Sequence, residues 1–204
     1  MNYSEEHLKE IIRCRDDIEY FADTYIKYSS YSGIVQVKLN DFQRKVIANF
    51  NEKKIFFEPG ERMSGKTTVA AIILLHQALF NEYRVSMIFA RTKSNSSLIV
   101  DLIYEMYERL PDFLCISKIS TRNRSKLDFD NMCSIISAGS DPNYARGRTI
   151  STIYIDESEW VESLDEILTM IYPVMASTPY AKIFSLSSTN TADILRKVKL
   201  EATI

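Results

Sequence analysis

A phosphate-binding loop is the feature of this sequence that most directly suggests chemistry. Residues 60–67 read GERMSGKT and fit the pattern G-x-x-x-x-G-K-[ST] in full. In such a loop, backbone N–H groups converge on phosphate oxygens, the lysine reaches the β- and γ-phosphates, and the hydroxyl binds Mg²⁺. A glycine-containing turn followed by a surface lysine is the structural alternative. The predicted nucleotide-binding residues here are Gly60, Glu61, Arg62, Met63, Ser64, Gly65, Lys66, Thr67 and Thr68.

A pair of acids supplies what a phosphate loop needs for hydrolysis. Asp156 and Glu157 follow the apolar run ISTIYI (150–155), which reads as a buried strand. Ligands of open α/β sheets bind at the carboxyl ends of strands, so both carboxylates are expected beside the loop. We predict that Asp156 holds Mg²⁺ and that Glu157 orients the attacking water or accepts its proton. Two acids at the start of a helix are the structural alternative.

Two further segments carry polar groups in suitable places. LNDFQ (39–43) offers Phe42 for stacking and Gln43, whose amide has a donor and an acceptor for the N6/N7 edge of adenine. A glutamine on an amphipathic helix is usually just solvated. SLSST (185–189) ends an apolar run, and its hydroxyl groups would either face the γ-phosphate or cap the next helix. Those hydroxyl groups belong to Ser187, Ser188 and Thr189.

Strands and helices must position these residues, and the hydrophobic pattern predicts that the two alternate. Apolar residues at three- and four-residue steps predict helices, and short apolar runs predict buried strands. This alternation indicates an α/β fold with a mostly parallel sheet covered on both faces. The predicted helices are 3–28, 39–50, 66–81, 94–110 and 164–175, the last broken by Pro173; the strands are 54–57, 84–90, 150–155 and 182–188, with a Ser-rich loop at 29–33 and a hairpin around Asp130 and Asn131.

Composition argues against several classes of protein. The chain has 204 residues, 46% of them apolar, and a formal net charge of −2, which fits one globular domain and not a protein whose whole surface binds DNA. Its 3 cysteines and 2 histidines show no metal-ligand spacing. The N-terminal segment MNYSEEHLKE is too polar for a signal peptide, and the longest apolar stretch, 69–80, is shorter than the ~20 residues of a membrane span.

Several other conspicuous residues are interpreted as structural. His76 lies inside an apolar helix and is expected in the core, and Trp160 is expected to pack. The basic segment 117–126 is interpreted as a charged hairpin edge, with contact to a DNA backbone as the alternative. A solvated acidic helix start accounts for Glu159, Glu162, Asp165 and Glu166.

Four segments in a fixed order, LNDFQ, GERMSGKTT, IYIDE and SLSST, resemble the N-terminal ATPase domain of large terminase subunits, the DNA-packaging motors of tailed bacteriophages. The similarity covers about residues 12–190, through CRDDIEYFADTYIKY, LPDFL and ARGRTISTIYIDESEW, and points to the contractile-tailed branch. Members of this family characteristically place an arginine three residues before the glycine of Gly-Lys-Thr, and that arginine is Arg62 here.

The resemblance implies a fold, a reaction and partners. It implies a P-loop fold with an additional strand and a catalytic glutamate, which uses ATP and Mg²⁺ to move double-stranded DNA into the prohead. The implied partners are the portal, the small terminase subunit and a nuclease domain in cis or in trans. Copies of the chain would form a ring when assembled and stay monomeric in isolation. The implied location is the host cytoplasm, and no association with a membrane is implied.

Individual residues take roles from the same resemblance. Gln43 matches the adenine-reading glutamine, and Ser187, Ser188 and Thr189 match the coupling motif. Arg146, in the segment ARG (145–147), resembles an arginine proposed to reach into a neighbouring subunit's site. The expected catalytic residues are therefore Lys66, Glu157, Arg62 and Arg146, and the expected metal ligands are Thr67 and Asp156.

The sequence departs from the family pattern at three points. The coupling segment continues as Ser-Ser-Thr-Asn where relatives have a Thr-rich motif followed by Pro-Asn-Gly, and Lys38 stands where relatives can carry a second adenine-facing amide. The third departure is a missing nuclease domain, so no DNA cleavage is expected. The expected organisation is a single ATPase domain over 1–204, with an N-terminal helical segment (1–37) and a nucleotide-binding core (38–204).

Two alternatives to a packaging motor remain open at the level of sequence. A helicase-like translocase also uses a glutamine-containing adenine motif and an Asp-Glu pair, but it needs a second RecA-like domain. A nucleotide-binding regulatory or assembly module with weak hydrolysis belongs to a different class. Measurement of ATP hydrolysis with and without a partner subunit distinguishes the motor from the module.

Overall fold

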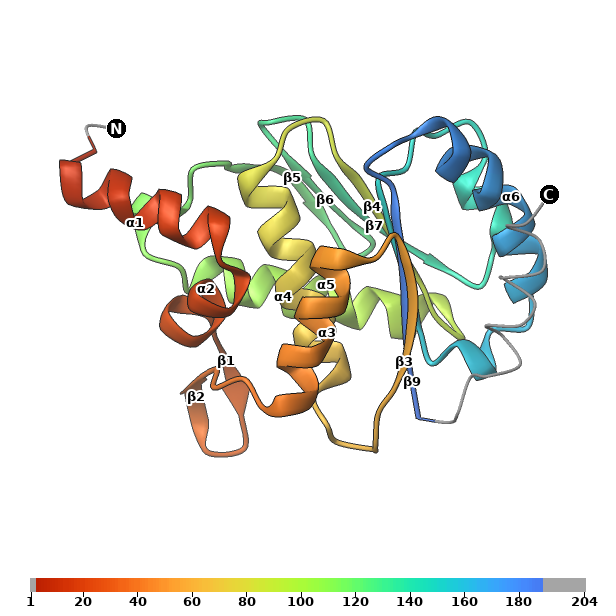
Figure 1. Cartoon of the computed structure of the whole chain (residues 1–204), viewed down its shortest axis with the longest axis horizontal. Coiled ribbons are helices and arrows are strands. Elements are labelled where there is room, and N and C mark those ends of the chain that lie inside the picture. The colour runs from red at the N-terminus through yellow and green to blue at the C-terminus, as the bar shows by residue number, and fades with distance from the viewer. Residues whose placement is uncertain (1–2, 189–204) are drawn as a thin grey trace.

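The structure is a computed structural model that describes residues 3–188, apart from the side chains of Tyr172 and of residues 174–177. A seven-stranded sheet with the order β3-β9-β8-β4-β7-β6-β5 forms its centre (Figure 1). The first five strands in that order are parallel, and β6 and β5 continue the sheet antiparallel. The strands are β3 (Ile55–Pro59), β4 (Val85–Phe89), β5 (Ile119–Asn123), β6 (Lys126–Phe129), β7 (Ser134–Gly139), β8 (Thr152–Asp156) and β9 (Lys182–Ser187).

Helices cover both faces of the sheet, which confirms the predicted α/β fold class. Figure 1 shows α1, α2, α3 and α4 on one side of β3 and β9 and α6 on the other, while α5 buries its apolar residues in the same core as α4. Because neighbouring strand residues point to opposite faces, Phe56 packs in the core of the first face and Phe57 in that of the second. The helices are α1 (Glu5–Asp16), α2 (Ile18–Tyr25), α3 (Asp41–Glu52), α4 (Lys66–Phe80), α5 (Lys93–Glu108) and α6 (Leu164–Ser177).

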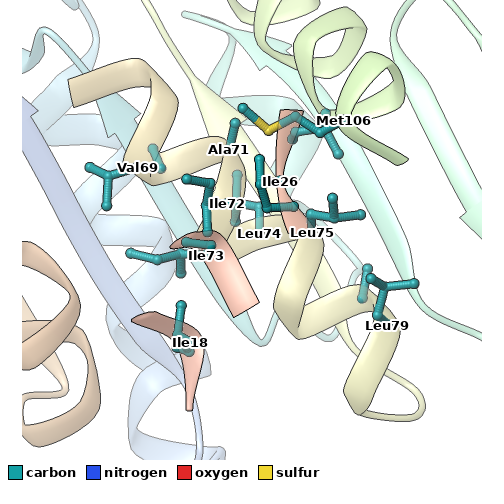
Figure 2. Close-up of a cluster of buried hydrophobic side chains, with 14 of the residues drawn as sticks. Ile18, Ile26, Val69, Ala71, Ile72, Ile73, Leu74, Leu75, Leu79 and Met106 are labelled. Carbon is teal, nitrogen blue, oxygen red and sulfur yellow. The ribbon is translucent and has the colours of Figure 1, made fainter. Parts of the chain in front are cut away.

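The helix that follows the phosphate loop lies at the centre of the larger core. Residues 69–75 of α4 are all fully buried, which agrees with a helix that is apolar on every side. Figure 2 shows side chains of α4, including Ile72 and Leu75, beside Ile18 and Ile26 of the N-terminal segment and Met106 of α5. This packing fixes the first residue of α4, Lys66, relative to the sheet.

The N-terminal segment differs from the predicted single helix over 3–28. Asp17 has an extended backbone (φ −134°, ψ 98°), ends α1 and caps α2 by accepting a hydrogen bond from the Tyr20 N–H group. The apolar pattern continues across this break, but the structure buries it unevenly: Leu8 and Ile12 of α1 are about half exposed, whereas Ile18 and Phe21 of α2 lie in the core. The predicted Ser-rich loop is also wrong: β1 (Lys27–Ser30) and β2 (Gly33–Gln36) pair there as an antiparallel hairpin.

The predicted break of the last helix at Pro173 is also wrong, since α6 continues through this residue to Ser177. A proline inside a helix costs about 3 kcal/mol because one hydrogen bond is lost and its ring clashes with the preceding turn. Burial of Leu164, Ile167 and Ile171 against the second face of the sheet offsets that cost. The helix therefore persists although its local sequence disfavours it.

The basic segment lies where the hairpin interpretation placed it. β5 is at the edge of the seven-stranded sheet and pairs with β6. Arg122 lies 3.7 Å from Asp101 and stacks over the ring of Tyr104, and Lys126 forms an ion pair with Asp128 at 2.8 Å. Charged side chains on an edge strand oppose pairing with other chains.

Within the described residues, no helix is long and apolar enough to cross a membrane.

His76 is confirmed as a core residue and leads to a prediction about acid stability. Its ring is 5% exposed, its Nε2 atom lies 2.9 Å from the carbonyl oxygen of Cys14, and burial lowers its pKa to about 4. The unfolded chain therefore takes up a proton near pH 6.5 and the folded chain only near pH 4. As pH falls from 7 to 5, we expect the free energy of unfolding to decrease by about 2 kcal/mol through this residue.

Urea unfolding of the wild type and of His76→Leu at pH 7 and pH 5 measures this effect. The variant should lose less stability than the wild type over the same pH interval. His7→Asn, at an exposed histidine, is the matched control and should keep the wild-type pH dependence. Equal losses in the wild type and in His76→Leu would contradict the assignment.

Candidate nucleotide site

The predicted phosphate loop connects β3 to α4 at the carboxyl end of the parallel strands. Gly65 has φ +83°, a left-handed conformation that suits glycine, and Lys66 begins the helix directly after it. The Gly60 N–H group donates to the Ser187 carbonyl oxygen at 2.8 Å, which ties the start of the loop to the end of β9. The Ser64 hydroxyl is buried without a hydrogen-bond partner among the described residues.

The first turn of α3 braces the phosphate loop. Asn40 Nδ2 donates to the Ser64 carbonyl oxygen at 3.1 Å, and Gln43 Nε2 donates to that of Gly65 at 3.2 Å. Gln43 Oε1 accepts the Asn40 N–H group at 3.0 Å and completes a capping box. A Cβ atom on Gly60 would lie 2.6 Å from the ring of Phe42, so both predicted adenine contacts pack against the loop itself.

This arrangement bears on the predicted recognition of adenine. Gln43 is 5% exposed, and both ends of its amide already bond to the chain. The structure therefore shows a role for Gln43 that the sequence did not indicate, namely support of the loop. Contact of Gln43 and Phe42 with the base stays a prediction.

The acidic pair lies at the end of β8. Asp156 is half-buried and accepts a hydrogen bond from the Tyr154 hydroxyl at 2.5 Å; burial, more than any other influence, raises the pKa of Asp156 to about 6. Glu157 has φ +45°, unusual for a residue with a side chain, and its N–H group donates to the Leu186 carbonyl oxygen at 3.0 Å. Such strain is commonly found at functional sites.

The loop and Glu157 meet at one pocket of about 630 Å³. Lys66 lies at its floor and donates to the carbonyl oxygens of Gly60 at 2.9 Å and Glu61 at 2.8 Å, positions from which its ammonium can turn to a phosphate. Asp156 is not among the lining residues; it is the last residue of β8, directly before Glu157 in the chain. The lining residues are Tyr28, Arg62, Met63, Gly65, Lys66, Thr67, Thr68, Glu157, Glu159, Trp160 and Ser188.

Three of these lining residues were not predicted as site residues. Tyr28 belongs to the hairpin that the sequence pattern missed, and no local signal indicates its position. Trp160 was expected to pack, but it is 52% exposed, and the guanidinium carbon of Arg91 lies 5.5 Å from its ring centre. Glu159 was interpreted as solvated, but it is half-buried and bonded to Ser187 and Ser188. Its place two residues after Glu157 was the signal that could have indicated it.

The remaining predicted residues are placed as follows. Ser187 is 1% exposed and Ser188 lines the pocket, while Thr189 lies outside the described residues. Arg146 does not reach the pocket: it lines a separate cavity of about 500 Å³ with Met170 and Thr178, beside the start of β9. The length of β8, roughly 15 Å at about 3.3 Å per residue, separates that end of the sheet from the phosphate loop.

The oxygen donors at this edge of the sheet fit Mg²⁺. The ion is typically bound by one or two carboxylates together with hydroxyl and phosphate oxygens. Thr67 at the start of α4 and Asp156 at the end of β8 supply a hydroxyl and a carboxylate at the same edge of the sheet. Among the described residues, no three His, Cys, Asp or Glu side chains lie close enough together to hold a metal ion.

The fold and this pocket together define a P-loop nucleotide-binding domain of the additional-strand type, because β9 lies between the phosphate-loop strand β3 and the acidic strand β8. The family model for the N-terminal part of T4-like virus terminase large subunits matches residues 60–193. The chain belongs to this family.

Three solved structures have the same fold. The large terminase of bacteriophage HK97 is 16% identical, with a TM-score of 0.70 over 93% of this chain and 42% of that one. The large terminase ATPase domain of Thermus phage P74-26 is 16% identical, with a TM-score of 0.62 over 75% and 66%. The large terminase of the thermophilic bacteriophage D6E, solved in complex with ADP, is 12% identical, with a TM-score of 0.54 over 74% and 39%. The chain thus spans less than half the length of the HK97 protein.

Proposed function

We propose that this chain binds and hydrolyses ATP with Mg²⁺ and that this reaction drives a viral DNA-packaging motor. The observation that carries the proposal is the pocket that the phosphate loop and the start of α4 share with Glu157, the residue that follows Asp156 at the end of β8. Membership of the terminase family supports a packaging motor over a helicase-like translocase. The ADP complex of the D6E relative supports an adenine nucleotide as the ligand.

The residues of the pocket divide the work of hydrolysis. The loop N–H groups and Lys66 hold the phosphates, and Arg62 of the same loop lines the pocket beside them. Glu157 orients a water for attack on the γ-phosphate and takes its proton. Thr67 and Asp156 would hold Mg²⁺, which neutralises charge on the phosphates when it is bound. Ser187 and Ser188, at the end of β9, respond to the loss of the γ-phosphate and transmit a conformational change to that strand.

The partners follow from the same proposal. Double-stranded DNA is the translocated substrate, and the portal and the small terminase subunit are the binding partners in the host cytoplasm. A nuclease domain, in cis or in trans, would complete the activities of a terminase. Copies of the chain would work as a ring on the portal and remain monomeric in dilute solution.

Replacement of Lys66 by alanine is expected to weaken ATP binding by roughly 30-fold or more, since removal of one partner of a buried charge pair typically costs 2–5 kcal/mol. Isothermal titration calorimetry with a non-hydrolysable ATP analogue and Mg²⁺ measures the affinity. Lys54→Ala, at an exposed lysine next to the start of β3, is the matched control and should bind like the wild type. Unchanged affinity in Lys66→Ala would refute the assignment of the phosphate loop.

A further inference from the structure

A third carboxylate, that of Glu159, lies at the wall of the nucleotide pocket. It belongs to the short 3-10 helix η3 (Ser158–Trp160), which follows the acidic pair directly. Both of its oxygens accept hydrogen bonds from the end of β9: Oε2 from the Ser187 hydroxyl, and Oε1 from the Ser188 N–H group at 3.2 Å. A surface acid that merely begins a helix would make neither bond.

The same end of β9 is also bonded to the other parts of the site. The Ser187 carbonyl oxygen accepts the Gly60 N–H group at 2.8 Å, and the Leu186 carbonyl oxygen accepts that of Glu157 at 3.0 Å. The Glu157 carbonyl oxygen in turn accepts the Trp160 N–H group at 2.9 Å. A continuous set of hydrogen bonds therefore joins the phosphate loop, the end of β9 and the turn that carries both glutamates.

Charge makes this set responsive to the nucleotide. Glu159 lines the same pocket as Glu157, and a γ-phosphate bound there would add negative charge close to both carboxylates. Hydrogen bonds to a charged acceptor are stronger than those between neutral groups, so the two β9 donors hold Glu159 against this repulsion. Loss of the γ-phosphate removes the repulsion and thereby changes the strength of the hydrogen bonds that Ser187 and Ser188 donate to Glu159.

We propose that Glu159 is a positioning residue that links the Glu157 turn to the end of β9. It holds Glu157 in place during hydrolysis, and through Ser187 and Ser188 it passes the loss of the γ-phosphate into the sheet. The inference rests on the ATP hydrolysis proposed above, but it concerns a residue outside the binding and water-activating set. It differs from an acid–base role because Glu159 acts through its two hydrogen bonds and not through its proton.

The test compares two substitutions that separate shape from charge. Glu159→Ala removes both bonds and should lower the single-turnover rate of ATP hydrolysis about 10-fold or more, with ATP affinity changed less than about 3-fold. Glu159→Gln should keep at least half of the rate, since an amide accepts from the Ser188 N–H group and donates to the Ser187 hydroxyl. Glu162→Ala removes an exposed acid of the same segment and should match the wild type.

A double-mutant cycle then identifies the partner. Ser187→Ala should slow hydrolysis, and Ser187→Ala combined with Glu159→Ala should be no slower than the worse single variant, because both remove the same link. Losses that multiply would overturn the proposal, and so would a Glu159→Gln variant as slow as Glu159→Ala. A wild type that does not hydrolyse ATP would instead refute the proposed function, so the two failures are distinguishable.

Discussion

Replacement of Glu157 by glutamine should leave ATP binding intact and reduce turnover by about 10²–10⁴-fold, the usual cost of losing a general base. Glutamine keeps the size of the side chain and its place in the strained turn after β8, but it cannot take a proton from the attacking water. The pocket keeps its phosphate loop and Lys66, so the affinity for the nucleotide should change little. Release of phosphate measured under single-turnover conditions, together with calorimetric binding, separates the two steps.

Glu162→Gln removes a negative charge at an exposed position five residues further along and is the matched control. It should hydrolyse ATP at the wild-type rate. A Glu157→Gln variant that retains wild-type turnover would show that another group activates the water. A variant that loses binding and turnover together would instead point to a structural role for Glu157.

The second large effect is expected from Arg146→Ala in an assembled ring, where hydrolysis should fall about 10³–10⁵-fold, as for other arginines that stabilise charge on a transferred phosphoryl group. Arg146 is exposed, lies beside Met170 of α6 and does not line the nucleotide pocket. Within the described residues it has no ion pair with an acid, and its Nε atom lies 3.5 Å from the sulfur of Met170. Action of Arg146 on a neighbouring subunit stays a prediction.

The dilute monomer supplies the contrast. It should hydrolyse ATP slowly and be almost unaffected by Arg146→Ala, whereas Arg62→Ala should lower its residual rate or its affinity, because Arg62 lines its own pocket. In the ring, mixing Arg146→Ala subunits with Glu157→Gln subunits should restore some activity at sites of mixed composition. Loss of activity in the dilute monomer on Arg146→Ala, without rescue on mixing, would assign this arginine a structural role.

The parts of the molecule with a local signal were predictable from the sequence. The phosphate loop is one continuous pattern whose strand and helix adjoin it, and the buried run before Asp156 indicates β8 by itself. The apolar residues of α4 indicate its burial without knowledge of its neighbours. For such elements the decisive interactions lie within a few residues, and the predicted and observed positions agree closely.

Other features depend on contacts between distant segments, so local patterns could not reveal them. The hairpin that holds Tyr28 is attached to α5, where Glu105 accepts the Ser29 N–H group at 2.5 Å and Arg109 donates to the Ser29 hydroxyl at 2.9 Å. Glu159 becomes a pocket residue only because β9 lies beside β8. The helix α6 continues through Pro173 because it packs in the core on the second face of the sheet, and the sequence of α6 alone gives no sign of that packing.

The pairing of β3 with β9 also orders the events of biosynthesis. β3 is one of the two edge strands of the sheet, its partner there is β9, and Ile55 lies opposite Ile183. A ribosome therefore completes the phosphate loop long before it makes the strand that holds the loop in place through the Gly60 to Ser187 hydrogen bond. Closing so long a stretch of chain is slow and entropically costly. We therefore expect the phosphate loop to reach its final position only after β9 has been synthesised and has paired with β3, and a chain interrupted before β9 should bind nucleotide poorly although it contains the loop.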